Sequence, residues 1–339
     1  MRAVVLDGTG AVQLTEIAEP VPGAHDVVVA PAAVGICGTD LHLVKGSYAT
    51  GRYPVVPGHE FAGTVVEVGA DVRGLSPGDL VGVDPNVACG VCRWCRVEAY
   101  NLCVRLEPVG VTRDGACAEQ VAVPARVVYR LPAGLDATVG ALIEPLACVL
   151  HALDRAPSLK DKDVLIYGAG SIGLLMCAVV KQRGAGRVQV VEPHAVRRAA
   201  AARLGADEAA AASANLDLAA GADVVVEASG HPAAVTDALR RIAVRGTLVQ
   251  MGVTAPETAV PLHPFDVFEK ELTVLGSNSL GDSYPAAVEQ IPDLAATIRP
   301  LVTHIIPLAS YAHALTVAAS PEALKVHVDP APPDRKATP

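Results

Sequence analysis

The stretch that decides the fold is 164–173, VLIYGAGSIG. An apolar run ends at a glycine-rich turn, and the residues that follow have the spacing of a helix. In such a turn the first glycine permits the bend, the second lets the backbone approach a pyrophosphate, and the third lets the helix pack on the strand. The N–H groups at the start of that helix can then bind the phosphates. We therefore predict a dinucleotide site with the loop residues Gly168, Gly170, Ser171, Ile172 and Gly173.

An acidic residue ends the next predicted strand. Glu192 lies nineteen positions after Gly173. A carboxylate there can accept hydrogen bonds from both ribose hydroxyls of NAD, and it repels the 2′-phosphate of NADP. Arg197 and Arg198 could bind that phosphate, or could simply form the solvated face of an alanine-rich helix. The sequence favours NAD over NADP, with Glu192 and Arg197 as candidate cofactor-binding residues.

The wider pattern predicts two domains of different class. From residue 163 onward, short apolar runs alternate with helical stretches of about 10–15 residues, which is typical of a doubly wound parallel sheet. Residues 1–149 are instead rich in Val, Gly and Pro, and their short apolar runs between turn residues predict a β-rich domain. A chain of 339 residues is long enough for both.

The composition excludes some classes of partner. The chain has 27 Lys and Arg against 36 Asp and Glu, a net charge of −9. Nucleic acids and anionic membranes are bound by basic surfaces, so we expect neither as a partner. No apolar stretch approaches the roughly 20 residues of a membrane span, and the N-terminus lacks the pattern of an export signal. We therefore expect a cytoplasmic protein.

Four of the eight cysteines are crowded into one short segment. Cys89, Cys92, Cys95 and Cys103 have the spacing C-x2-C-x2-C-x7-C, which lets four thiolates surround one Zn²⁺ tetrahedrally. Such a site has no open position, so it stabilises a loop and catalyses nothing. An iron–sulfur cluster is the competing interpretation, but the Cys-Pro of the bacterial ferredoxin pattern is missing. We predict a structural zinc.

A second set of residues suits a zinc ion with one position left open. It comprises CGTDLH at 37–42 and GHE at 58–60, which together offer a thiolate, an imidazole and a carboxylate. Each residue alone would be an ordinary structural residue, because a lone Cys37 is usually a small core residue and a lone His59 a hydrogen-bonded one. The hypothesis depends on their coincidence with the other motifs.

Together these motifs resemble the zinc-dependent medium-chain alcohol dehydrogenase superfamily. The resemblance runs nearly end to end, and its motifs are GICGTDLH (35–42), VPGHEFAGTVVEVG (56–69), PGDLVGV (77–83), the four cysteines, DGACAEQVAVP (114–124), IEPLACVLHAL (143–153), GAGSIG (168–173) and ALKVHVDP (323–330). Asp40-x-His42 and Glu144-Pro145 are more similar to the polyol (sorbitol) and threonine dehydrogenase branch than to the simple-alcohol branch.

The resemblance implies roles for individual residues. Cys37, His59 and Glu60 should surround a catalytic zinc, and Glu144 should bind it directly or through water. Thr39 resembles the first member of a proton relay that His42 completes, although His42 could also be a plain surface residue. Asp40 either orients a zinc ligand or caps the following helix.

The resemblance also implies an architecture. A GroES-like catalytic domain should comprise 1–149 and 286–339, and a Rossmann NAD-binding domain should comprise 150–285, with the active site between them. Relatives pair their Rossmann sheets edge to edge, so we expect a homodimer or homotetramer.

The implied reaction is oxidation of a small-molecule alcohol with two Zn²⁺ per chain and NAD. The substrate would be a polyol, a cyclitol or aminocyclitol, or a sugar, whose secondary hydroxyl becomes a ketone. Sorbitol itself fits poorly, because sorbitol-type relatives place an Arg near 278–280, where this chain reads Asn-Ser-Leu. Cys117 stands where relatives commonly carry Phe or Tyr, which predicts a wider substrate pocket. The alternatives are an L-threonine-type 3-hydroxy amino acid dehydrogenase and a non-catalytic zinc- and dinucleotide-binding protein.

Overall fold

The structure, a computed structural model, describes residues 1–47 and 51–331. The chain forms two compact units, Met1–Glu144 with Tyr284–Pro339, and Pro145–Ser283. The sequence-based boundaries at 149/150 and 285/286 fall a few residues later, inside helices α3 (Ile143–Asp154) and α8 (Tyr284–Ile298). The C-terminal segment returns to the first unit, so the second unit is an insertion in it. Residues 332–339 of the predicted GroES-like domain lie outside the described residues.

The second unit is built on a parallel sheet with the order β12-β11-β10-β13-β14-β15. Its central strands are valine-rich and buried on both faces, as expected for parallel strands covered by helices on each side. The strands are β10 (Asp163–Tyr167), β11 (Arg187–Val191), β12 (Glu208–Ala210), β13 (Ala222–Glu227), β14 (Ile242–Gln250) and β15 (Thr273–Gly276). The predicted doubly wound sheet is confirmed.

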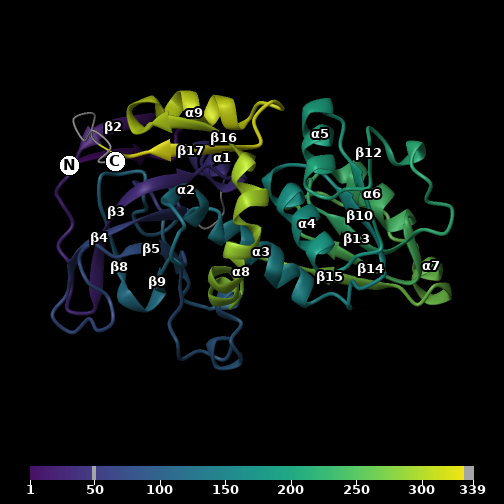
Figure 1. Cartoon of the computed structure of the whole chain (residues 1–339), viewed down its shortest axis with the longest axis horizontal. Coiled ribbons are helices and arrows are strands. Elements are labelled where there is room, and N and C mark those ends of the chain that lie inside the picture. Colours follow the sequence, from purple (N-terminus) through teal and green to yellow (C-terminus); the bar gives the residue numbers. More distant parts are fainter. Residues whose placement is uncertain (48–50, 332–339) are drawn as a thin grey trace. The chain divides into compact units, whose positions relative to one another are not determined.

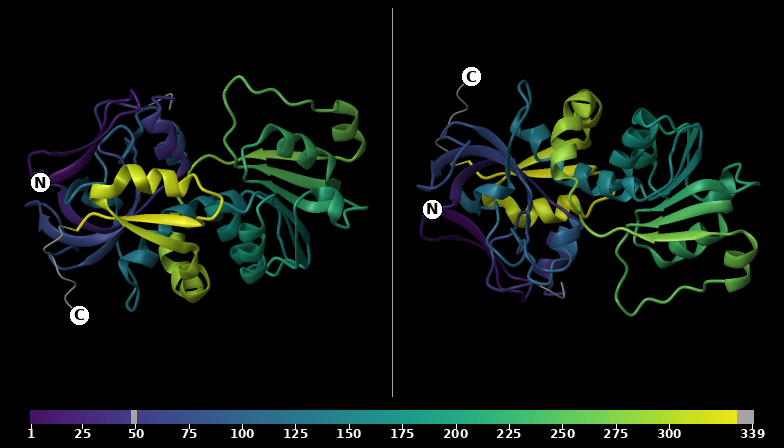
Figure 2. Two further views of the ribbon diagram at one scale, coloured as in Figure 1. Left: turned by 90° about the horizontal axis from the view of Figure 1, so that it is seen from above. Right: turned by 90° about the horizontal axis from the view of Figure 1, so that it is seen from below.

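The direction in which the chain crosses this sheet reverses between β12 and β13. Right-handed crossovers therefore place α4 and α5 on one face and α6 on the other (Figure 1). The carboxyl ends of β10 and β13 meet at this reversal, which is where open α/β sheets bind ligands. Residues 251–263 run outside the sheet as an extended segment (Figure 2). The helices are α4 (Ser171–Gln182), α5 (Ala195–Arg203), α6 (Pro232–Arg240), α7 (Pro264–Glu269) and the 3-10 turn η4 (Ser213–Asn215).

The first unit is β-rich, as its sequence predicts. Its main sheet has the order β16-β17-β3-β4-β5-β9, and β8 also pairs with β3. Strand β3 is central and almost wholly buried, and it pairs antiparallel with β17, β4 and β8. The strands of this sheet are β3 (Asp26–Gly35), β4 (Glu60–Val68), β5 (Leu80–Val83), β8 (Val121–Pro124), β9 (Val128–Arg130), β16 (Val302–Pro307) and β17 (Lys325–Asp329).

Two small sheets and several helices complete this unit. β1 (Arg2–Leu6) pairs with β2 (Val12–Glu16), and β6 (Asn86–Val87) pairs with β7 (Glu107–Pro108). The helices and 3-10 turns are α1 (Gly38–Val44), η1 (Cys95–Val97), η2 (Tyr100–Leu102), η3 (Ala125–Val127), α2 (Ala137–Gly140), α8, η5 (Arg299–Leu301), η6 (Leu308–Ser310) and α9 (Tyr311–Ala318).

Contrary to the expectation from the sequence, one apolar stretch is long enough to cross a membrane. Ala137–Asp154, which contains α2 and α3, is the single such stretch among the described residues. It is 72% buried inside the structure, which is typical of helices that belong to the core of a globular domain.

Candidate active site

Three potential metal ligands meet in the first unit. One ligand atom each of Cys37, His59 and Glu60 lies within 4.8 Å of the others. Cys37 follows β3 and caps α1, whereas His59 and Glu60 stand at the start of β4. Because β3 and β4 are antiparallel, with Gly35 opposite Glu60, the end of one strand meets the start of the next. A thiolate, an imidazole and a carboxylate at this spacing fit a zinc ion.

Asp40 lies beside this cluster, and of its two predicted roles the structure shows the helix cap. Its side chain is fully buried, and Oδ2 accepts a hydrogen bond of 2.8 Å from the backbone N–H of Cys37, which caps α1. Oδ1 faces Nδ1 of His59 at 3.7 Å. At this distance the two atoms form no hydrogen bond, so Asp40 faces the ring of His59 as an acidic group beside the cluster.

The charges around His59 favour a bound cation. Burial lowers the pKa of His59, but Asp40 and then Cys37 outweigh burial and raise the pKa well above its ordinary value. The negative groups that attract a proton to the ring will also attract a metal ion. Because zinc binds the unprotonated imidazole, the proton leaves when the ion binds.

Glu144 lies near this cluster but outside it. It is 7% exposed, in the first turn of α3, and it interacts electrostatically with His59 and with Lys325. Among the described residues, the group of ligand atoms within 4.8 Å of one another contains Cys37, His59 and Glu60 without Glu144.

The two residues of the expected proton relay share α1. The Sγ of Cys37 and the Oγ1 of Thr39 are 4.0 Å apart and form a hydrogen bond. His42, one helical turn later, is exposed, and its Nδ1 lies 3.3 Å from Oγ of Ser47. Thr39 therefore stands beside the metal cluster, and His42 stands in contact with solvent.

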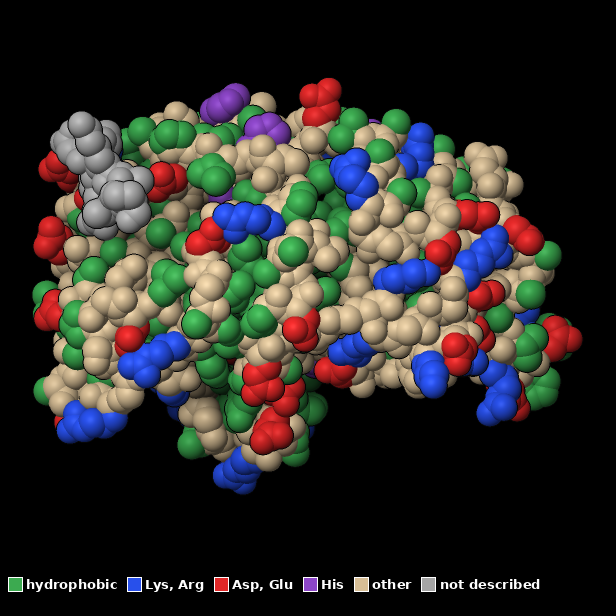
Figure 3. All heavy atoms as spheres, viewed as in Figure 1, with side chains coloured by type: hydrophobic (Ala, Val, Ile, Leu, Met, Phe, Trp, Pro, Cys, Tyr) green, Lys and Arg blue, Asp and Glu red, His purple; other side chains and the backbone are tan. Residues whose placement is uncertain are grey.

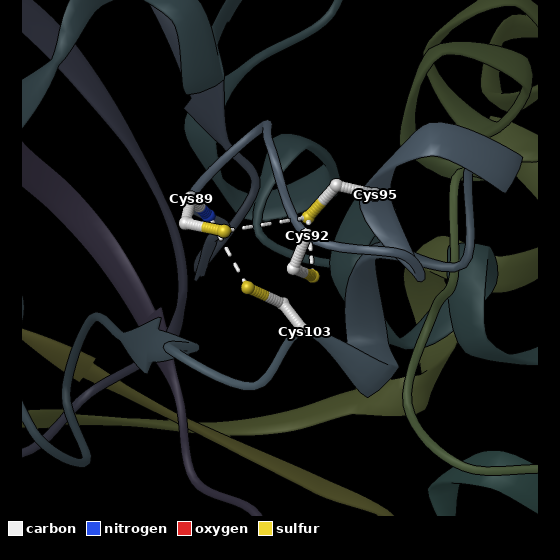
Figure 4. A group of neighbouring side chains, drawn as sticks. All are labelled: Cys89, Cys92, Cys95 and Cys103. Carbon is white, nitrogen blue, oxygen red and sulfur yellow. Dashed lines mark hydrogen bonds between the residues drawn. The ribbon is translucent and has the colours of Figure 1, made fainter.

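The four clustered cysteines converge on one point (Figure 4). The Sγ atoms of Cys92 and Cys95 are 3.5 Å apart, and those of Cys89 and Cys95 are 3.9 Å apart. Zn–S bonds of about 2.3 Å in a tetrahedron require an S–S separation of about 3.8 Å, so the sulfurs fit zinc. Backbone N–H groups, that of Val91 first, lower the pKa of Cys89 to about 5. This thiol is therefore ready to bind a metal as the thiolate.

The glycine-rich loop of the second unit has the form that its sequence predicts. Gly168 has φ +90°, a bend that glycine allows at little cost. An added Cβ at Gly170, the N-cap of α4, would meet open space. At Gly173 it would collide with the carbonyl of Gly168. The second glycine therefore leaves room for a ligand, and the third lets the helix pack on the strand, with Ser171 and Ile172 opening α4 between them.

Glu192 ties this loop to the next helix. Its side chain is buried, and Oε2 accepts the N–H of Ala169 while Oε1 accepts the N–H of His194, both at 2.9 Å. Arg198 donates to the backbone carbonyls of Glu192 and Pro193, at 2.8 and 2.6 Å. Arg197, on the same helix, is half-buried.

The comparisons with known proteins agree with both units. A family model described as an alcohol dehydrogenase GroES-like domain matches residues 23–133, and one described as a zinc-binding dehydrogenase matches residues 171–293. Over 314 residues the chain is 34% identical to D-altritol 5-dehydrogenase of Agrobacterium fabrum, which covers 91% of this chain and 93% of that enzyme. This chain belongs to the zinc-binding alcohol dehydrogenase family. It is therefore an oxidoreductase of the kind that acts on alcohol groups.

Other relatives carry different names. The dehydrogenase is 33% identical to L-threonine 3-dehydrogenase of Saccharopolyspora erythraea, over 97% of this chain and 99% of that one. A solved zinc-binding dehydrogenase of Sinorhizobium meliloti, bound to NADP, is 34% identical, with a TM-score of 0.91 over 97% of this chain and 99% of that chain. The predicted fold, a GroES-like domain with a Rossmann domain, is confirmed.

One buried acidic residue of the Rossmann domain was not among the predicted site residues. Glu227, at the carboxyl end of β13, is fully buried and accepts hydrogen bonds from the N–H groups of Ser229 and Gly230 and from the amide of Gln250. It thereby joins the loops that follow β13 and β14, beside the glycine-rich loop. The only sequence signal was an acidic residue at the end of a valine run.

A second missed residue is Lys325 of the GroES-like domain. It is buried and ion-paired with Glu60. Burial by itself would raise the pKa of Glu60, but Lys325 and then His59 outweigh burial and lower it, so the carboxylate is ionised. The available signal was a lysine and a histidine within the short valine-rich run 325–328.

Cys117 differs from its prediction. Its side chain is 1% exposed and belongs to the hydrophobic core, where it packs against the turn at Gly58 and interacts with Tyr311. The smaller residue therefore fills space in the core and does not form the wall of an open pocket.

Proposed function

We propose that this dehydrogenase oxidises a secondary hydroxyl of a polyol, a cyclitol or aminocyclitol, or a sugar to a ketone, with NAD as the hydride acceptor. The observation that carries the proposal is the buried cluster of Cys37, His59 and Glu60 with Asp40 behind it. Similarity to D-altritol 5-dehydrogenase supports the polyol class.

In this proposal, zinc when bound lowers the pKa of a coordinated hydroxyl, and the nicotinamide ring accepts the hydride. Cys37 and His59 would hold the metal, Glu144 would contribute directly or through water, and Asp40 lies 3.7 Å from the ring of His59. The hydroxyl proton passes to Thr39 beside the cluster, and then to His42, which releases it to solvent.

The test is a panel of polyols, cyclitols, sugars and amino alcohols, assayed for NAD reduction with and without a metal chelator. The proposal expects polyols, cyclitols or sugars to be oxidised, and expects the chelator to stop the reaction. Preference for L-threonine would favour the second candidate, which the similarity to L-threonine 3-dehydrogenase supports. Dinucleotide binding without turnover, with one zinc per chain, would indicate the non-catalytic alternative.

The choice of NAD depends on Glu192. The net loss of one hydrogen bond between a ribose hydroxyl and a carboxylate costs about 1.5–3 kcal/mol. We therefore expect Glu192→Ala to lower kcat/KM for NAD by about 10–100-fold, and to lower kcat/KM for NADP far less, because the repulsion of the 2′-phosphate also disappears. Steady-state kinetics with both coenzymes measures this.

Arg203→Ala, at the exposed end of α5, is the control, and it should leave the preference for NAD unchanged. The relative from Sinorhizobium meliloti is bound to NADP. Kinetics with both coenzymes therefore decide between a preference for NAD and a preference for NADP. A wild-type preference for NADP, or a Glu192→Ala variant with unchanged NAD kinetics, would contradict the assignment.

The proposed assembly is a homodimer or homotetramer, located in the cytoplasm and without a nucleic-acid or membrane partner. β15 is an edge strand, and its Val274 is 51% exposed. The helix before it in the chain, α7, carries Phe265 and Phe268, which are 65% and 79% exposed. Such an edge favours pairing with a second copy. On the face drawn in Figure 3, basic side chains are interspersed with acidic ones. The mass in solution tests the oligomer, since Val274→Lys should yield monomers.

A further inference from the structure

Lys325 is a charged group in the interior of the GroES-like domain that the mechanism above does not use. Its side chain is 1% exposed, and its ammonium is paired with Glu60, whose side chain is 2% exposed. The same ammonium donates a hydrogen bond of 3.1 Å to the carbonyl of Ile36, the residue before Cys37. Lys325 therefore contacts both segments that carry the metal cluster.

The strand order explains how a residue near the C-terminus reaches this place. β3 lies between β17 and β4, and Gly35 of β3 pairs with Glu60 on one side and with His327 on the other. Gly35 has no side chain, so Lys325 and Glu60 can meet across it. An added Cβ at Gly35 would collide with the carboxylate of Glu60 and would lie 2.9 Å from Cε of Lys325.

Lys325 is the cation that is directly ion-paired with Glu60. His327 is also fully buried, two residues after Lys325 on the same strand. Removing one member of a buried ion pair leaves an uncompensated charge, which the protein tolerates poorly. A Glu60 without its ammonium would need another cation.

A metal ion held by the neighbouring cluster would be such a cation. A carboxylate oxygen of Glu60 lies within 4.8 Å of ligand atoms of both Cys37 and His59. A carboxylate is a good zinc ligand, whereas a catalytic zinc needs one position free for water or substrate. Glu60 can pair with the ammonium of Lys325 or bind zinc. Pairing with Lys325 would leave a coordination position of the zinc free for the substrate, whereas binding zinc would fill that position.

We propose that Lys325 is a positioning residue that competes with the catalytic zinc for Glu60. The ion pair holds the carboxylate back from the metal, so that a coordination position stays open for the substrate hydroxyl. This inference rests on the proposed zinc site at Cys37 and His59.

The test compares zinc affinity in the wild-type protein and in Lys325→Met, by competition with a chromophoric chelator. Met keeps the length of the side chain and removes the charge. We expect the weaker of the two zinc ions to bind about tenfold more tightly or better, because Glu60 becomes a ligand and the nearby positive charge is gone. The kcat should fall at least about tenfold, with KM for NAD unchanged.

A purely structural role for Lys325 predicts the opposite sign, because a loosened cluster binds zinc less tightly. The four-cysteine site serves as an internal reference in every variant. Lys325→Arg, which keeps the charge, should restore the wild-type zinc affinity and the visible spectrum of the cobalt-substituted protein. Lys181→Met, at an ion pair with Asp207 in the other unit, is the matched control and should change neither zinc affinity nor kcat.

Two further variants keep the test decisive. If Lys325→Met does not fold, Lys325→Gln removes the charge while its amide can still donate to Ile36, and the same tightening is expected. Adding Glu60→Gln to Lys325→Met or Lys325→Gln should abolish the increase in zinc affinity. Equal or weaker zinc binding in the neutral variants would overturn the proposal alone, whereas a wild-type chain that holds a single zinc would overturn the proposed function as well.

Discussion

Replacing Cys37 by serine will abolish alcohol oxidation and remove one of the two zinc ions from each chain. Serine is almost isosteric with cysteine, but its hydroxyl stays protonated at neutral pH and does not replace a thiolate as a zinc ligand. Lewis-acid stabilisation by the metal is worth several kcal/mol, so turnover should fall by about 10³-fold or more. Elemental analysis for zinc and the rate of NAD reduction measure the two effects on the same sample.

Cys148→Ser is the control for this variant. Cys148 is half-buried on α3 and belongs to neither metal cluster, so both zinc ions and the turnover should be retained. Loss of the four-cysteine zinc in Cys37→Ser would show that the variant has unfolded. Undiminished turnover in Cys37→Ser would show that the cluster of Cys37, His59 and Glu60 is not catalytic.

Replacing Cys95 by serine will remove the other zinc and destabilise the GroES-like domain. The segment 89–105 has little core of its own, because Val91, Val97 and Val104 are 58%, 66% and 68% exposed. Its regular structure consists of short 3-10 turns. Apolar burial therefore contributes little here, and metal binding supplies the folding free energy. A loss of about 3–5 kcal/mol should lower Tm by about 10 °C, at about 2–4 °C per kcal/mol.

Thermal unfolding followed by circular dichroism, with zinc content, measures this effect. The remaining zinc should still support some turnover below the new Tm, because Cys95 does not contact the catalytic cluster. Cys148→Ser again serves as the control and should leave Tm within a few degrees of wild type. An unchanged Tm in Cys95→Ser, with one zinc lost, would show that the four-cysteine site does not stabilise the fold.

The features that could be predicted from the sequence are those formed by residues that lie close together along the chain. The sheet of the Rossmann domain follows from short buried apolar runs such as β10 and from the glycine-rich turn after it. The four cysteines lie within one short segment, so their spacing alone indicates a tetrahedral site. In both cases the interacting residues are close along the chain.

The catalytic cluster needed more than spacing. Cys37 and His59 are brought together by the pairing of β3 with β4, and the distance between them along the chain says nothing about that pairing. Resemblance to a family supplied the expectation, and the structure supplies the geometry.

Contacts between distant segments could not be predicted. The bond from Lys325 to Ile36 joins residues 289 positions apart, and it depends on β17 lying beside β3. The burial of Cys117 could not be predicted for the same reason. It depends on Gly58 and Tyr311, which come from other parts of the chain. Glu227 was missed because its partners are mostly backbone N–H groups, which every sequence contains.

The most direct test of the account is a zinc titration of the metal-free protein in the presence of NAD and an oxidisable polyol. The four-thiolate site should fill first, without any formation of NADH, and the rate should then rise in proportion to the second equivalent of zinc. A full rate after the first equivalent, or in the metal-free protein, would contradict the claim that zinc at Cys37 and His59 carries the reaction.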